Sequence, residues 1–180
     1  MIITVLDFDD TIFPTTKYNE SKIIDIERTY HCISKFINSI RIFCQVIYII
    51  TNASEDWIHH CFKNILNKPT HCLENIKIIS SIDKGYTKQL EISDWKKVTF
   101  EKVLIEYLNC SSENIFLFIG DNPYDRDGAL YIMKSYPQHK VKSLKFKCRP
   151  SLESLIKQQE DVIEMLVRIL FMEENLDLQL

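Results

Sequence analysis

The sequence predicts an α/β fold in which a parallel sheet of about five strands carries helices on both faces. Three apolar runs rich in β-branched residues have the continuous hydrophobicity of strands buried on both sides: residues 2–7, 46–50 and 115–119. Segments with helical spacing of apolar residues alternate with these runs along the chain. This alternation favours a parallel sheet, because parallel neighbours must be joined by crossover connections.

The other elements follow the same alternation and complete a three-layer, Rossmann-like architecture. Helices are expected at residues 29–43, 55–66, about 93–108 and 123–134, and further strands at 76–79 and 141–146, the last at a sheet edge. Ser93 or Asp94 is the expected N-cap of the helix that runs to residue 108.

The remaining segments are connections and a terminal helix. Residues 12–28 are polar and irregular, which predicts a flap, and residues 81–92 predict a loop. A helix over residues 150–174 is expected to pack on the core, because its apolar positions form one stripe. With 180 residues the chain is long enough for one domain, 1–180, present as a monomer or a homodimer.

Composition and charge narrow the class of protein. The net charge of −3 gives no electrostatic reason to expect non-specific nucleic-acid binding. No apolar run approaches the ~20 residues that a membrane-spanning helix needs, and the first residues lack the basic segment of a secretion signal. The six cysteines contain no C-x-x-C pair and are expected to be free thiols. These observations predict a cytoplasmic protein without a membrane partner.

The stretch that follows the first strand carries the strongest functional signal. Asp7-Phe8-Asp9-Asp10-Thr11 places three carboxylates at the mouth of a buried strand. Such carboxylates repel one another and lose hydration, so they are tolerated where a cation neutralises them. The usual cation at such a site is a hard divalent metal ion, which prefers oxygen ligands such as carboxylates. The alternative is a capped turn or a weak cation site without catalysis.

Further polar residues follow the other strands. Thr51 ends the second strand, Asp121 follows the fourth, and Asp125 lies one helical turn beyond Asp121. Ligands of parallel sheets bind at the carboxyl ends of the strands, so these side chains are expected to lie near Asp7. A lysine at the start of the helix before the fourth strand can bring a cation to the same point.

Together these motifs resemble the haloacid dehalogenase superfamily of phosphohydrolases, in its small, uncapped form. The D-x-D-x-T motif is matched in full at residues 7–11, and the G-D-x-x-x-D motif is matched at residues 120–125. The Thr or Ser of the second motif is Thr51. These two acidic motifs are specific together, whereas a threonine and a lysine alone are weak signals.

Two assignments within the resemblance have alternatives. Lys96 is favoured over Lys97, because Trp95, Lys96 and Phe100 fit a W-K-x-x-x-F pattern of some small members. Asp127 is the alternative to Asp125 as the second acid of the last motif.

Aromatic residues could also contribute to the site. Tyr18, Trp57 and Tyr86 could line a substrate entrance, although packing is the more common role of such side chains.

The resemblance implies a Mg²⁺-dependent phosphoester hydrolase. Asp7 would be the nucleophile that forms an aspartyl-phosphate, and Asp9 would protonate the leaving oxygen and then activate water. The implied metal set is Asp7, Asp9 through its backbone carbonyl, Asp121 and Asp125. The implied substrate-binding set is Thr11, Thr51, Asn52 and Lys96.

The lengths of the segments between the motifs indicate the class of substrate. Members of the superfamily differ in cap domains, and neither the 12–28 flap nor the 81–92 loop is long enough for an independent cap. An open site suits a macromolecular substrate such as a phosphoprotein, since a small metabolite usually needs a closing lid. The alternatives are a polynucleotide 3′-phosphatase, which the lack of basic charge disfavours, and a catalytically silent binding or scaffold protein.

Overall fold

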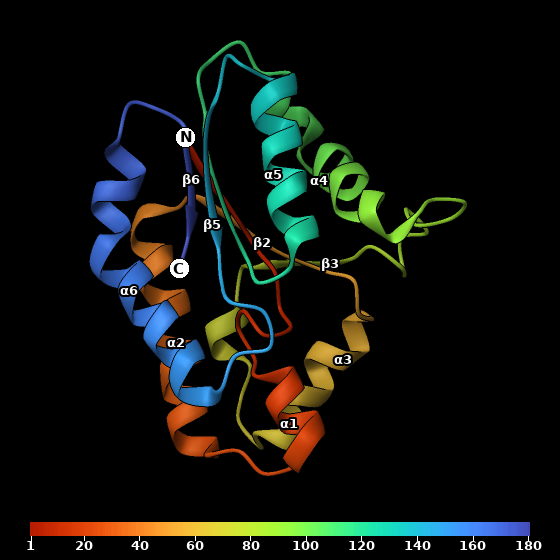
Figure 1. Ribbon diagram of the computed structural model, residues 1–180, viewed down its shortest axis with the longest axis vertical. Helices are drawn as coiled ribbons and strands as arrows, with labels where there is room; N and C mark the ends of the chain where they lie inside the picture. The colour runs from red at the N-terminus through yellow and green to blue at the C-terminus, as the bar shows by residue number, and fades with distance from the viewer.

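The computed structural model describes residues 1–180 and contains a six-stranded, fully parallel sheet with helices on both faces (Figure 1). The strands are β1 (Ile2–Leu6), β2 (Val46–Thr51), β3 (Lys77–Ser80), β4 (Ile115–Gly120), β5 (Lys140–Lys145) and β6 (Leu176–Gln179), in the order β3-β2-β1-β4-β5-β6. The predicted fold class is confirmed. The strand count of about five is one too low, because β6 has only four residues and was not predicted.

The chain builds the sheet outward from its centre in both directions. β1 pairs with β2 on one side and with β4 on the other, so the strand order reverses beside β1. β1, β2 and β4 are the three continuous apolar runs, and their central position explains why both faces of these strands are buried.

The prediction that β5 lies at an edge of the sheet is wrong. β5 pairs with both β4 and β6, so β6 and β3 form the edges. Within this inner strand Lys142 is fully buried. Its amine donates hydrogen bonds to the carbonyls of Met172 and Glu174, which follow the last helix.

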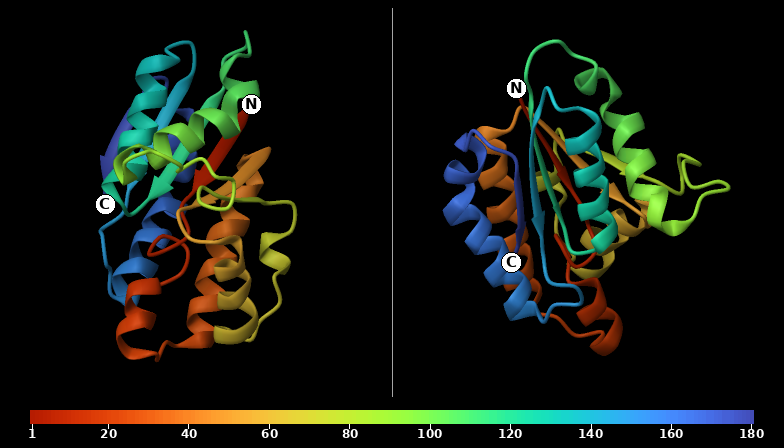
Figure 2. Two further views of the ribbon diagram at one scale, coloured as in Figure 1. Left: turned by 90° about the vertical axis from the view of Figure 1, so that its right-hand side faces the viewer. Right: turned by 45° about the horizontal axis from the view of Figure 1, so that its top comes forward.

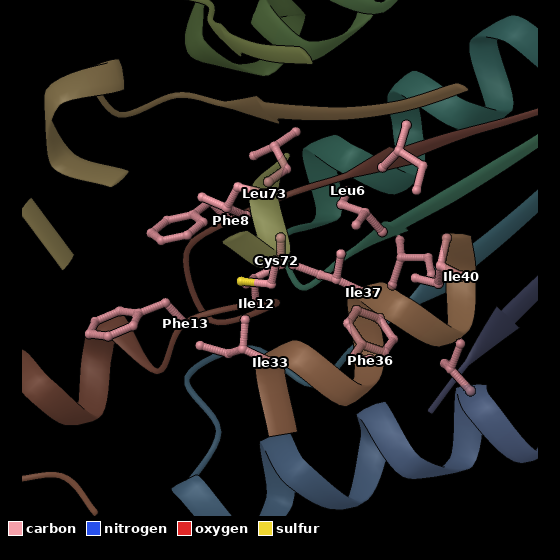
Figure 3. Packing of buried hydrophobic residues seen from close by; sticks show 14 of the residues in the cluster. Leu6, Phe8, Ile12, Phe13, Ile33, Phe36, Ile37, Ile40, Cys72 and Leu73 are labelled. Carbon is pink, nitrogen blue, oxygen red and sulfur yellow. The ribbon is translucent and has the colours of Figure 1, made fainter. Parts of the chain in front are cut away.

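Two helix layers cover the sheet (Figures 1 and 2). α2 (Ile26–Phe43) and α6 (Leu152–Phe171) lie on one face, and α4 (Ile92–Leu108) and α5 (Pro123–Ser135) lie on the other. Each pair buries a separate apolar cluster against the sheet. Figure 3 shows the larger cluster, in which Ile33, Phe36, Ile37 and Ile40 of α2 meet residues of the chain after β1.

The segment predicted as an irregular flap, 12–28, contains ordered helix. α1 (Thr15–Ser21) occupies its middle, and α2 begins at Ile26, earlier than expected. Asp25 caps α2 by accepting a hydrogen bond from the Arg28 N–H. The first turn of α1 is held from outside the helix by Asp10, which accepts from the Thr16 N–H at 2.8 Å. Because Asp10 lies outside the helix, helical spacing and capping patterns in the sequence do not predict this contact.

Three other helix boundaries differ from the expectation. The helix after β2 is α3 (Glu55–His60), which continues as a π-helical turn, η1 (Cys61–Ile65), and a short 3₁₀ helix, η2 (His71–Leu73), precedes β3. The cap of α4 is Glu91, so neither Ser93 nor Asp94 takes that position. The terminal helix ends at Phe171 rather than at 174, because the chain then turns into β6.

Two further expectations concern cysteines and membrane spans. All six cysteines are free thiols, as predicted. No helix combines the length and the apolar character that crossing a membrane would require.

Candidate active site

The candidate site lies at the carboxyl ends of β1 and β4, beside the point where the strand order reverses. Leu6 pairs with Ile119, so Asp7 lies level with Gly120, and Asp121 is the next residue of the neighbouring chain segment. The backbone N–H of Asp7 donates to the carbonyl of Ile119 at 2.9 Å, which extends the ladder into the site. The sheet itself therefore brings together two acids that are far apart in sequence.

Asp7, Asp121 and Asp125 form an acid cluster. One carboxylate oxygen from each lies within 4.8 Å of the others, and the three residues are only 8%, 9% and 4% exposed. Asp125 closes a capping box with Asn122, whose backbone N–H donates to Asp125 Oδ2 at 3.3 Å. This cap directs the Asp125 side chain back toward the sheet.

Gly120 makes room for that arrangement. A Cβ atom at residue 120 would lie 2.5 Å from Cγ of Asp125, closer than non-bonded atoms approach. The glycine is therefore required by a close approach of the Asp125 carboxylate and not by its backbone angle.

Lys96 reaches the acid cluster from α4. Its amine donates to Asp7 Oδ1 and to the carbonyl of Ile50, each at 2.5 Å, and lies 2.8 Å from Asp125 Oδ1. The side chain is 3% exposed. Lys97 points elsewhere and pairs with Asp94 at 3.0 Å on the surface. Of the two lysines considered from the sequence, Lys96 is therefore the one that meets Asp7.

Close packing of α4 against α5 helps to place Lys96. A Cβ atom at Gly128 of α5 would lie 2.8 Å from the ring of Phe100, one turn beyond Lys96 on α4. The missing side chain at residue 128 lets the two helices approach, with Asp125 on one and Lys96 on the other. Asp127 is exposed and lies outside the acid cluster.

Burial and mutual repulsion perturb the acids. Burial raises the pKa of Asp7 well above its usual range, and Asp125 adds to the rise while Lys96 opposes it. Burial, with Asp125 and Asp10 nearby, raises the pKa of Asp121 to about 7. Burial alone would lower the pKa of Lys96, but its contacts with Asp125 and Asp7 outweigh burial and leave it above its ordinary value.

These charges make the acid cluster a suitable metal site. Three buried carboxylates lie together, and a single lysine amine contacts two of them, so the ionised cluster carries excess negative charge in a place with little water. A divalent cation would remove this excess, and the donors are all oxygens, which hard cations prefer. The residues present therefore fit a metal ion held by Asp7, Asp121 and Asp125.

Asp9 lies outside the acid cluster and has different partners. Its Oδ1 accepts hydrogen bonds from the Thr15 hydroxyl at 2.6 Å and from the indole N–H of Trp57 at 2.8 Å. Its Oδ2 is 3.4 Å from the hydroxyl of Thr51. The carboxylate of Asp9 therefore meets hydroxyl and indole donors and is not part of the acid cluster, although Asp9 lines the same cavity as the three acids.

Asp10 has a structural role. It adopts a left-handed backbone conformation, with φ of 56°, and its carboxylate accepts from both the N–H and the hydroxyl of Thr16. The turn at Asp10 reverses the chain after Asp9, and its side chain ties the start of α1 to that turn.

The expected substrate-binding residues divide into two groups. Asn52 and Lys96 line a cavity of about 420 Å³ in front of Asp7. Thr51 is fully buried behind this cavity, with its hydroxyl toward Asp9 and the N–H of Ala53. Thr11 is fully buried too and does not line the cavity, so its side chain is not accessible from the cavity.

Sequence reasoning missed several residues that form this cavity. The wall also includes Thr16, Asn122, Tyr124, Cys148 and Arg149, which come from α1, from the start of α5 and from the connection after β5. Asn122 and Tyr124 come shortly after β4, and Cys148 and Arg149 come shortly after β5, which was the available signal. No motif marked them, and Thr16 in α1 had no such signal. Arg149 closes the rim through an ion pair with Glu20 of α1 at 3.2 Å.

Two of the three aromatic residues considered from the sequence have packing roles. Tyr18 lies against Phe13, with ring centroids 6.1 Å apart, and Tyr86 lies under the amine of Lys102. Neither lines the cavity. Trp57 does not line the cavity either, but its indole N–H donates to Asp9, which does.

The chain matches no family model, and no curated protein or solved structure shows significant similarity to it. The case for a function therefore depends on the geometry of this site. The decisive features are the acid cluster, the buried lysine that neutralises part of it, and the separate carboxylate of Asp9.

Proposed function

We propose that this chain is a Mg²⁺-dependent phosphoester hydrolase of the haloacid dehalogenase type, acting through an aspartyl-phosphate on Asp7. One observation carries the proposal: Lys96, 89 residues from Asp7 in sequence, places its amine 2.5 Å from Asp7 Oδ1 inside a cluster of acids. A carboxylate can attack an anionic phosphorus only where positive charge reduces the repulsion.

The residues divide the reaction between them. An oxygen of Asp7 attacks phosphorus, the bond to the leaving oxygen breaks, and a proton on Asp9 moves to that oxygen. Water then attacks the aspartyl-phosphate, gives a proton to Asp9 and releases phosphate and free Asp7. Mg²⁺ would be held by Asp7, Asp121 and Asp125 and would supply charge neutralisation of the phosphoryl group. Lys96 favours the ionised form of Asp7 for the attack, and its charge reduces the repulsion between anionic groups in both steps.

A phosphoprotein is the substrate class that we favour. The loop between β3 and α4 projects from the side of the molecule and forms no separate cap domain (Figures 1 and 2). The cavity wall carries five aspartates and only two cations, Lys96 and Arg149. A polynucleotide would bring many phosphates toward this acidic cavity, whereas a phosphopeptide brings one.

The test compares two variants on two substrates. We expect Asp7→Asn to lower kcat with Mg²⁺ by at least about 10³-fold, because the amide cannot attack phosphorus. Asp127→Asn, a matched change on the exposed side of α5, should retain activity. Circular dichroism checks that both variants fold.

The substrates are a phosphopeptide and a 3′-phosphorylated oligonucleotide. Faster hydrolysis of the phosphopeptide is expected, and preference for the oligonucleotide would favour the polynucleotide phosphatase instead. Undiminished activity of Asp7→Asn would refute the mechanism. Lack of turnover of both substrates by the unaltered protein would favour a silent binding protein.

A further inference from the structure

Asp9 is held by two hydrogen-bond donors that lie outside the recognised motifs. The Thr15 hydroxyl of α1 and the indole N–H of Trp57 in α3 both donate to the same oxygen, Oδ1, at 2.6 and 2.8 Å. The other oxygen, Oδ2, meets only the Thr51 hydroxyl at 3.4 Å, which is at the long limit for a hydrogen bond. The two oxygens of Asp9 are therefore unequal.

Both donors are fixed by their surroundings. The Trp57 ring meets Phe13 edge to face, with centroids 6.3 Å apart, and stacks on His60 at 5.7 Å. Phe13 belongs to the core cluster of Figure 3. Thr15 begins α1, whose next residue, Thr16, is bonded to Asp10. Trp57 cannot turn away from Asp9 without disturbing this packing, and Thr15 is held near Asp9 by its place at the start of α1.

We propose that Trp57 and Thr15 are positioning residues that make Oδ2 of Asp9 the oxygen that exchanges protons with the leaving group and with water. A carboxylate oxygen has two lone pairs, and the two donors occupy both on Oδ1. A proton on Asp9 is therefore carried by Oδ2. It passes to the leaving oxygen as the bond from phosphorus to that oxygen breaks, and a proton from the attacking water later restores it.

This inference rests on the proposed function, so the kinetic test separates proton transfer from the rest of the reaction. Trp57→Phe removes the donor but keeps a ring against Phe13, and Thr15→Val removes only the hydroxyl. The value of kcat/KM is measured with an alkyl phosphate, whose leaving oxygen needs a proton, and with a dinitrophenyl phosphate, whose leaving group does not.

We expect kcat/KM for the alkyl phosphate to fall about 10-fold in each variant and about 10²-fold in the double variant, but less than about threefold for the aryl phosphate. Trp95→Phe is the matched control, because the Trp95 indole donates to the carbonyl of Leu90 in an exposed loop. It should change neither value. Equal losses with both esters would overturn the positioning role, since damage to the fold affects both alike.

A second measurement does not require turnover. The chain has two tryptophans, so the Trp95→Phe protein shows a single indole N–H resonance, that of Trp57. We expect Asp9→Ala to shift this resonance and to speed its exchange with solvent, whereas Asp127→Asn leaves it unchanged. A resonance that does not respond to Asp9→Ala overturns the inference.

Together the two measurements distinguish a failure of this inference from a failure of the proposed function. If the unaltered protein hydrolyses neither ester, the proposed function fails, and the indole resonance alone then decides whether Trp57 holds Asp9.

Discussion

Replacing Lys96 with methionine tests the electrostatic logic of the site most directly. The change keeps the length of the side chain and removes the charge. The lost contacts are those with Asp7 at 2.5 Å, with the Ile50 carbonyl at 2.5 Å and with Asp125 at 2.8 Å, all around a side chain that is 3% exposed. Breaking a buried ion pair costs about 3–5 kcal/mol, because the partner is left charged and unpaired.

We therefore expect Lys96→Met to lower the free energy of unfolding by about 4 kcal/mol at pH 8, measured by urea denaturation without metal. The loss should shrink at pH 5.5. Without the lysine, the folded-state pKa of Asp7 rises further above its unfolded value of 3.8. A group with a raised folded pKa takes up a proton in the native state as the pH falls, so stability returns below that pKa.

The neighbouring lysine is the control for this experiment. Lys97 is 34% exposed and pairs only with Asp94, so Lys97→Met should cost less than about 0.5 kcal/mol. A loss below about 1 kcal/mol for Lys96→Met, or a loss that does not depend on pH, would refute the reasoning.

Three further predictions concern the acid cluster and its support. Gly120→Ala should weaken Mg²⁺ binding by at least about tenfold in calorimetry, because the new Cβ would lie 2.5 Å from Asp125 Cγ. Mg²⁺ binding at pH 7 should release at least about half a proton, measured in buffers of different ionisation enthalpy, because burial raises the pKa of Asp121 to about 7 and that of Asp7 well above its usual range, and both must be ionised to bind. Gln159→Leu should lower the free energy of unfolding by about 1–3 kcal/mol in urea, because the buried Gln159 amide donates to the carbonyl of Thr11 at 2.9 Å.

Each of these predictions has a result that would contradict it. Unchanged Mg²⁺ affinity in Gly120→Ala would mean that Asp125 is not a ligand. Proton uptake on binding would contradict the metal site, since protons and a cation compete for the same carboxylates. An unaltered unfolding midpoint in Gln159→Leu would mean that α6 does not support the turn after β1.

The sequence was informative about the centre of the fold. β1, β2 and β4 are continuous apolar runs, and such runs are stable only where both faces of a strand are covered. The sequence was less informative about the strands at the edges of the sheet. β6 has four residues and depends on pairing with β5 and on an ion pair between Arg126 and Asp177, so its local sequence hardly marks it.

The same division applies to the site. The positions of Asp7 and Asp121 followed from the sequence alone, because parallel strands bring their carboxyl ends to one edge of the sheet. Which lysine meets Asp7 did not follow, since it depends on the rotation of α4 and on its close approach to α5 at Gly128. The contact of Trp57 with Asp9 spans 48 residues and no periodicity encodes it. Local patterns thus determined the strands and the acids that end them, whereas side-chain partners depended on how the helices pack, which only the tertiary structure decided.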